Sequence, residues 1–242
     1  RSRGLGDVYK RQVQSDKTKL VGIKMNKLFK DIRHSDVDAV RAAISKNIAV
    51  VNEVYTAKAP KKDIGQSPLQ VAIKCGEFEI IELLLENGAD PDFMENPELV
   101  PPHSVCMSVL HDAIIGVFSS LCYEQYISSE KYVNLIEVLL KKGANPNRKT
   151  SSKVLPIGTT VHQAEGILCH ESAYPDIQEI ARNRLFEVLD LLIKYGANKE
   201  EWLNQDFWGV SNKVHYFEEK HYGMNNVDIR EPIRIALKEY FG

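Results

Sequence analysis

The sequence predicts an all-α solenoid, in which helix-turn-helix units stack through short hairpin-like turns. One phrase recurs, as ELLLENGADPD at 82–92, VLLKKGANPN at 138–147 and LLIKYGANKE at 191–200. Each copy is an apolar helical run followed by a glycine, which favours the left-handed conformation that ends a helix. A second pattern, typical of helix starts, precedes each copy. A single unit of this kind cannot bury its apolar face alone, so stacking is expected.

The first unit, residues 63–92, shows both patterns most clearly. A turn comes first, then Ser67 as a helix N-cap with Pro68 at the first helical position, where its missing N–H costs nothing. Gly76 ends this helix, and a second apolar helix runs up to Gly88. The small residue after that glycine lets the chain turn tightly toward the next unit.

The order of these elements resembles an ankyrin repeat, a family with T-P-L-H-x-A, then a G-x-x-E-I-V-x-L-L-L helix and G-A-D-x-N. The first unit has S-P-L-Q-V-A, G-E-F-E-I-I-E-L-L-L and G-A-D-P-D. Helix starts resembling the same motif follow as SVLHDA at 108–113 and TTVHQA at 159–164. The resemblance implies an ankyrin-repeat solenoid. It assigns structural roles to Pro68, Leu69, Gly88, Ala89, His111, Gly143, Ala144, His162, Gly196 and Ala197, with the two histidines bonding between neighbouring turns.

The second and third units are longer than the first. Leu69 precedes Ile80 by 11 positions, whereas the equivalent pairs are 25 and 27 positions apart. Insertions of about 14 and 16 residues are therefore expected between the two helices of each unit. We predict lengthened helices joined by short loops, with Ser129 capping the second helix of one unit and Pro175 starting that of the next.

Degenerate repeats are expected at both ends. Residues 25–54 resemble an N-terminal capping repeat, and 231–242 resemble a truncated C-terminal one whose polar outer face Arg234, Lys238 and Glu239 would supply. We therefore predict a single ankyrin-repeat domain over 25–242, in which the stretch 200–226 departs from the repeat pattern.

The first 30 residues carry nine Lys or Arg and two acidic residues, although the net charge of the whole chain is −2. We expect 1–24 to be a disordered basic leader. Its opening RSRGLGDVYKRQ is typical of cloning-adapter sequence, which would exclude it from fold reasoning. The alternative is a tail that binds nucleic acid or an acidic surface. The near-neutral total argues against a general nucleic-acid binder, so we expect no specific nucleic acid as a partner.

The composition also indicates in which cellular compartment the protein is expected. No stretch approaches 18 consecutive apolar residues, so no membrane span is expected. The four cysteines form no C-x-x-C pair, which argues against a zinc signature and favours free thiols in a reducing compartment. We expect a cytoplasmic monomer without a metal or cofactor.

Candidate partner-binding residues follow from the family's hairpin tips and concave face. They are Asp63, Gln66, Lys74, Cys75, Phe93, Met94, Glu95, Arg148 and Lys149. Phe93 and Met94 are apolar residues at a tip, and the alternative is that they pack under the Pro-rich connection 93–107. The aromatic segment 201–223 is either a binding surface or, as we favour, a satellite core.

These features favour a non-catalytic module that binds another protein through its concave face and hairpin tips. The alternative is a regulatory or inhibitory protein that occludes an enzyme or toxin through the insertions and the aromatic segment. An enzyme is a third hypothesis, based on the adjacent Cys169, His170 and Glu171. Adjacent residues rarely face each other productively, and H-E-x-x-H, P-loop and G-x-S-x-G motifs are absent from the sequence.

Overall fold

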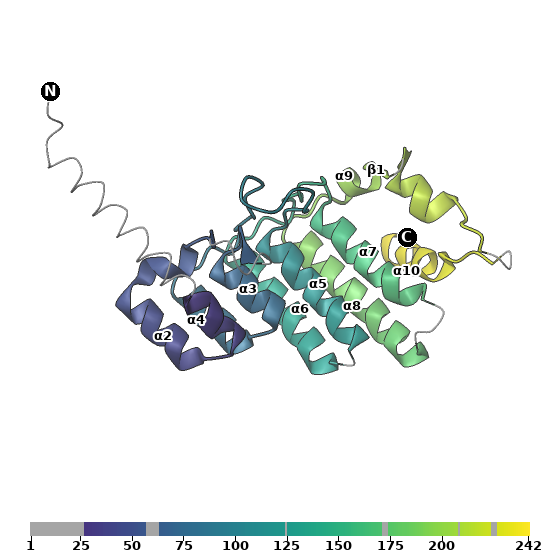
Figure 1. Ribbon diagram of the computed structural model, residues 1–242. Coiled ribbons are helices and arrows are strands. Elements are labelled where there is room, and N and C mark those ends of the chain that lie inside the picture. Colours follow the sequence, from purple (N-terminus) through teal and green to yellow (C-terminus); the bar gives the residue numbers. More distant parts are fainter. Residues whose placement is uncertain (1–26, 57–62, 124, 171–173, 208, 224–226) are drawn as a thin grey trace, which may run out of the picture. The chain divides into compact units, whose positions relative to one another are not determined.

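The computed structural model describes residues 27–56, 63–123, 125–170, 174–207, 209–223 and 227–242 (Figure 1). The predicted basic leader at 1–24 lies outside the described residues. The chain forms two compact units. Unit 1 extends to Asp90 and includes Glu95–Ser104, and unit 2 comprises Pro91–Met94 and Val105–Gly242. We describe each unit by itself, and a single domain over 25–242 stays a prediction.

Unit 1 holds the N-terminal cap and the first full repeat. Its helical elements are residues 27–33, α2 (Val37–Lys46), η1 (Ile48–Asn52), α3 (Pro68–Cys75) and α4 (Phe78–Glu86). The Ser67 hydroxyl accepts a hydrogen bond from the Gln70 amide at 3.2 Å, which confirms the predicted N-cap. Gly76 ends α3 in the left-handed conformation. Most apolar residues of α3 and α4 are almost fully buried where the two helices pack, and Phe78 is half-buried.

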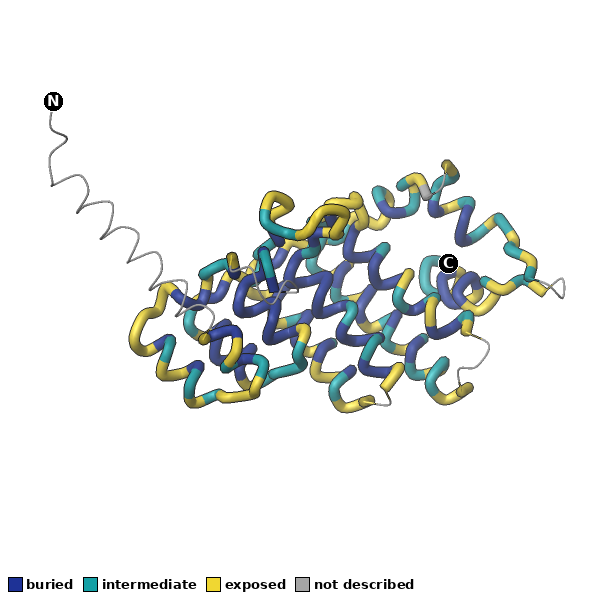
Figure 2. The backbone as a smooth tube through the Cα atoms, viewed as in Figure 1, coloured by how far each residue is buried: buried dark blue, intermediate teal, exposed yellow. Residues whose placement is uncertain are grey.

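Unit 2 consists of two long helix pairs and a C-terminal segment. The pairs are α5 (Val109–Cys122) with α6 (Tyr126–Lys141), and α7 (Pro156–Leu168) with α8 (Pro175–Lys194). The segment comprises α9 (Lys199–Leu203), β1 (Asp206–Phe207), β2 (Val210–Ser211), η3 (Val214–Glu218) and α10 (Glu231–Phe241). α5 packs against α7, α6 against α8, and α10 against α7. Figure 2 shows buried residues concentrated in the helix bodies and exposed ones at their connecting loops.

The longer helices confirm the predicted character of the insertions. The helices of unit 2 have 14, 16, 13 and 20 residues, against 8 and 9 in α3 and α4. Pro175 starts α8, as predicted. The predicted cap at Ser129 is wrong, because α6 begins at Tyr126 and Ser129 lies buried one turn inside it. None of the described helices is both long and apolar enough to cross a bilayer.

The repeated glycines adopt the predicted conformation. Gly88, Gly143 and Gly196 have φ angles of 84°, 103° and 93°, in the left-handed region that penalises a Cβ. A Cβ built on any of the three would meet nothing within 4 Å. The backbone conformation, rather than crowding, therefore explains why glycine recurs at the end of each second helix.

The last residue of the repeated phrase forms hydrogen bonds to the next turn. The Asn147 side chain accepts a bond from the Asn198 amide at 2.7 Å and donates one to the Gly196 carbonyl at 2.8 Å. Asn52, in the N-terminal cap, makes the same pair of bonds to the Asp90 amide and to the Gly88 carbonyl, each at 2.8 Å. The phrase thus ends one helix and, through its final side chain, orients the following turn.

Asp92 varies this pattern within unit 2. Its carboxylate accepts the Asn145 amide at 3.0 Å but has no N–H for the Gly143 carbonyl. It binds the Arg148 guanidinium instead, through Nε at 2.9 Å and a second contact to Nη2. The predicted tip residue Arg148 therefore stabilises the turn that contains Asp92.

The third repeat starts one helical turn earlier than the sequence alignment indicates. α7 begins at Pro156, whose position corresponds to Pro68 and Val109, so His162 lies inside the helix with 70% of its side chain exposed. The structural role predicted for His162 is wrong. His111 does have that role, because it is fully buried, 2.8 Å from Ser108 Oγ and 3.3 Å from the Val154 carbonyl. Counted from Ile157, the third repeat reaches Val188 after 31 positions, so its insertion is about 20 residues.

The C-terminal segment contains a satellite core. Trp202 is 1% exposed and stacks on Tyr216 and Phe241, with ring centroids 5.9 and 5.7 Å away. This supports the core interpretation for these residues, whereas Trp208 lies outside the described residues. Arg234 is buried and bound to Asp228 through Nε at 3.2 Å, so its predicted place on a polar outer face is wrong.

Candidate functional site

Several predicted contact residues of unit 1 are engaged in contacts within the unit. Asp63 is fully buried and receives the Arg33 guanidinium through Nε at 3.0 Å and through Nη2. Cys75 is half-buried with its sulfur 3.5 Å from Nη1 of the same guanidinium. A buried carboxylate requires such a partner to offset its desolvation. The Asp63 hydrogen bond in turn raises the pKa of Arg33 above its ordinary value.

Burial corrects part of the predicted contact set. Asp63, Gln66 and Glu95 are 0%, 7% and 5% exposed, so their side chains have no surface to offer a partner. Glu95 binds Lys74, with 3.0 Å between Oε1 and Nζ. Lys74 itself is exposed, and its contact with a partner stays a prediction.

The predicted tip residues of unit 2 are only partly accessible. Phe93 and Met94 are half-buried, and their backbones are tied to the start of α5 by a hydrogen bond from the Val109 amide to the Phe93 carbonyl and by a bridge between Met94 and Ser108. Lys149 is exposed, with Nζ 2.6 Å from Glu201 Oε1. A role for these residues in binding stays a prediction.

Unit 2 also contains a groove along α5 and α7, which we call the inner groove. One end is a hollow of about 440 Å³ among the tips, α7 and the C-terminal segment. The other is a hollow of about 480 Å³ between the C-terminal halves of α5 and α7. The two hollows share His162 and Gln163, so they adjoin on α7.

The walls of the inner groove differ along its length. The tip hollow is lined by apolar side chains that remain partly exposed, namely Val105, Met107, Ile115 and Val154. The polar side chain of Gln205, from the C-terminal segment, faces them. The second hollow has Phe118 and Ile167 beside the charged pair Glu165 and Arg230. An apolar patch edged by polar groups is typical of an interaction surface.

The charged pair is linked to the satellite core. Arg230 Nε lies 2.8 Å from Glu165 Oε1, and the Tyr216 hydroxyl donates to Glu165 Oε2 at 3.2 Å. Burial is the main cause that raises the pKa of Tyr216, with the Glu165 carboxylate adding to it. The hydroxyl therefore stays protonated at neutral pH and can keep donating to Glu165.

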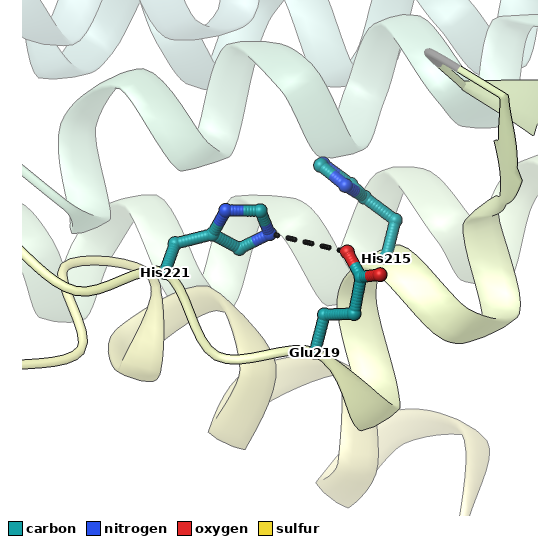
Figure 3. A group of neighbouring side chains, drawn as sticks. All are labelled: His215, Glu219 and His221. Atoms are coloured by element: carbon teal, nitrogen blue, oxygen red, sulfur yellow. Dashed lines mark ion pairs between the residues drawn. The ribbon is translucent and has the colours of Figure 1, made fainter.

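A cluster of two histidines and one glutamate lies next to Arg230. His215, Glu219 and His221 each direct one donor atom into a common region, with these atoms all within 4.8 Å of one another (Figure 3). Burial, followed by the charge of Arg230, lowers the pKa of His215 to about 4. Sequence reasoning, which expected no metal ligands, missed this cluster. The spacing H-x3-E-x-H over 215–221 was the available signal.

Cys169 and His170, the two described residues of the catalytic hypothesis, give it no support. Cys169 is half-buried, and burial raises the pKa of its thiol, which disfavours the reactive thiolate. His170 is exposed beside it, and Glu171 lies outside the described residues.

Comparison with known proteins supports the repeat assignment. Residues 64–96 match the ankyrin repeat family. The chain is also 26% identical over 146 residues to a fowlpox virus (strain NVSL) protein named as a putative ankyrin repeat protein. That match covers 55% of this chain and 18% of the viral protein, so the chain spans under a fifth of that relative.

Proposed function

Because this chain is an ankyrin-repeat protein, we propose that it is a non-catalytic module that binds another protein, with the inner groove of unit 2 as its binding surface. Ankyrin repeats are generally protein–protein interaction modules. The observation that carries the proposal is the run of partly exposed apolar side chains at the tip hollow. Val105 and Val154 keep 41% and 36% of their surface exposed although neighbouring apolar residues are buried.

The shape and chemistry of the groove favour a polypeptide over a small ligand. Two adjoining hollows along α7 make the site longer than either one. Its polar groups, such as Gln163 and Gln205, are spread along this length instead of converging on one point. An extended segment can place apolar side chains in the tip hollow while its backbone meets amide side chains.

An alternative is a regulatory protein that occludes an enzyme or toxin with its insertions. It is supported by exposed apolar residues at the helix ends that the insertions create. Tyr123, Ile127 and Tyr174 are 76%, 75% and 69% exposed. The aromatic segment gives this alternative less support, because Trp202 and Tyr216 are buried in the satellite core.

Site-specific photo-crosslinking separates the two proposals. A benzophenone amino acid replaces His162 in the groove, Ile127 at the insertion end, or Val138 on the exposed side of α6 as a control. Illumination in native lysate should attach one partner at His162 and leave Ile127 and Val138 unmodified. A partner attached at Ile127 alone favours the alternative, and equal labelling at all three positions contradicts both.

We also propose a cytoplasmic location. The four cysteines, all among the described residues, are thiols and not disulfides, as a reducing compartment would keep them. Fractionation of cells expressing the tagged chain tests this, and recovery of the chain in a secreted fraction would contradict it.

A further inference from the structure

We propose that His215, Glu219 and His221 bind a divalent transition-metal ion, with Zn²⁺ the best fit, and that Arg230 competes for the same site. The proposal is independent of partner binding. His215 and Glu219 are four positions apart on the single π-helical turn η3 and its C-cap, which places them on one side. His221 follows two residues later. Figure 3 shows the Glu219 carboxylate directed at His221, 3.9 Å between Oε2 and Nε2, with His215 beside them.

The surrounding structure holds the histidines in place. The His221 amide donates to Asp228 Oδ1 at 3.1 Å, and its carbonyl accepts the Ile229 amide at 2.8 Å. The neighbouring bridge between Tyr222 and Asp228 fixes the same stretch of backbone. His215 is 4% exposed, with its ring edge-on to Tyr216 at 4.8 Å between centroids. A site held by its supporting contacts loses little entropy when it binds an ion.

The site already accommodates a cation. Arg230 Nη1 lies 3.3 Å from His221 Nε2, 3.3 Å from His215 Nδ1 and in closer contact with His215 Nε2. A guanidinium has only donors, so an imidazole nitrogen that accepts a hydrogen bond from it uses its lone pair, and each neutral ring has one such nitrogen. That lone pair is the same one that coordinates a metal. The cluster therefore directs electron pairs toward a positive charge.

Arg230 can release the cluster without losing its own counter-ion. Its Nε is 2.8 Å from Glu165 Oε1, outside the cluster, and Glu165 has only 14% of its side chain exposed. A small rotation of the guanidinium head about this contact would free both imidazoles. Since two cations repel at this distance, metal and guanidinium should exclude each other.

The donor set selects the metal. Two imidazole nitrogens and one carboxylate suit Zn²⁺ and poorly suit Ca²⁺ or Mg²⁺, which prefer oxygen ligands. Tetrahedral Zn²⁺ with bonds of about 2.0–2.2 Å requires donors roughly 3.4 Å apart. The three ligand atoms lie within 4.8 Å of one another, so they must move slightly closer together to bind the ion. The half-exposed Glu219 side chain has room to do so.

Zinc titration of the full chain tests the site. Calorimetry with ZnCl₂ should give one ion per chain, and separate titrations with CaCl₂ and MgCl₂ should give none. His221→Ala and Glu219→Gln should each weaken binding by about 10-fold or more, since even outer-shell losses cost that much. Arg230→Gln should tighten it. His162→Ala and His170→Ala, both exposed and outside the cluster, should leave it unchanged.

Cobalt adds a readout that reports the ligands of the bound ion as well as its presence. Co²⁺ bound in the cluster should give visible absorption bands that His221→Ala removes, while circular dichroism confirms that the variant remains folded. Absence of Zn²⁺ binding by the native chain overturns the proposal, whatever Arg230→Gln does. Binding that survives in both His221→Ala and Glu219→Gln overturns it as well, because the ion would then sit elsewhere.

Discussion

The two ends of the helix pairs in unit 2 are built in different ways. At what we call the joint end, the turns after α6 and α8 meet the starts of α5 and α7. There the contacts are polar and residue-specific, as in Asn147 with Gly196 and His111 with Val154. At the insertion end, where α5 leads into α6 and α7 into α8, the helices bury apolar side chains such as Val117, Leu121 and Leu168.

This difference explains which parts of the sequence repeat. A hydrogen-bonded joint needs a particular donor or acceptor at a particular place, so the same residue types recur in each repeat. A packed helix extension only needs apolar residues of suitable volume, so its sequence and length vary. Substitutions at the joint end should therefore act through polar groups, and those at the insertion end through volume.

The largest expected effect is the pH dependence that His111 imparts to the joint end. Burial lowers its pKa to about 4, so between pH 6.5 and 4 the unfolded chain binds a proton that the folded chain does not. Stability should be full above pH 6.5 and fall by roughly 3 kcal/mol as the pH drops to 4.

Urea unfolding of the wild type and of His111→Gln across this pH range measures the effect. The wild type should lose more stability than the variant, and the difference isolates His111 although His215 titrates in the same window. His162→Gln, at an exposed histidine, should keep the wild-type slope. Equal slopes for all three proteins would contradict the buried, neutral state of His111.

At the insertion end, Gly116→Ala should destabilise by about 1–3 kcal/mol through overpacking. A Cβ there would lie 2.5 Å from the Tyr132 ring where α5 meets α6, although alanine favours helices. Gly166→Ala is the matched control in α7, because nothing lies within 4 Å of its Cβ. It should stabilise by about 0.5–1 kcal/mol. Thermal melting should move the two variants in opposite directions, and a shared direction would show that packing does not control this region.

Removing a joint hydrogen bond should cost somewhat less. Asn147→Ala loses both bonds to the following turn and should destabilise by about 1–2 kcal/mol in chemical denaturation. Asp92→Asn is the control, because it keeps an acceptor for Asn145 and removes the charge that pairs with the half-exposed Arg148. It should change stability by less than about 1 kcal/mol. A larger loss in Asp92→Asn would show that the ion pair, not the Asx contact, holds the turn.

The smallest effect isolates backbone conformation in unit 1. Gly88→Val should cost about 1 kcal/mol or more, because φ is 84° and valine avoids this region. Gly88→Asn should cost only a few tenths, since asparagine tolerates the left-handed conformation. No atom lies within 4 Å of a Cβ built at this position, so the Cβ itself meets no crowding. Equal melting temperatures for Val and Asn would contradict the C-cap role.

Local patterns in the sequence determined the repeats, the helix starts at Pro68 and Pro175, and the glycine-ended helices, because caps and φ preferences act within a few residues. Register in the third repeat was not determined, since TTVHQA resembled the motif more closely than the true start at Pro156. Only the tertiary structure decided that Asp63 and Arg234 are buried ion-pair residues and that His162 faces the inner groove. It alone brought His215, Glu219 and His221 together with Arg230, because such contacts depend on how distant segments pack.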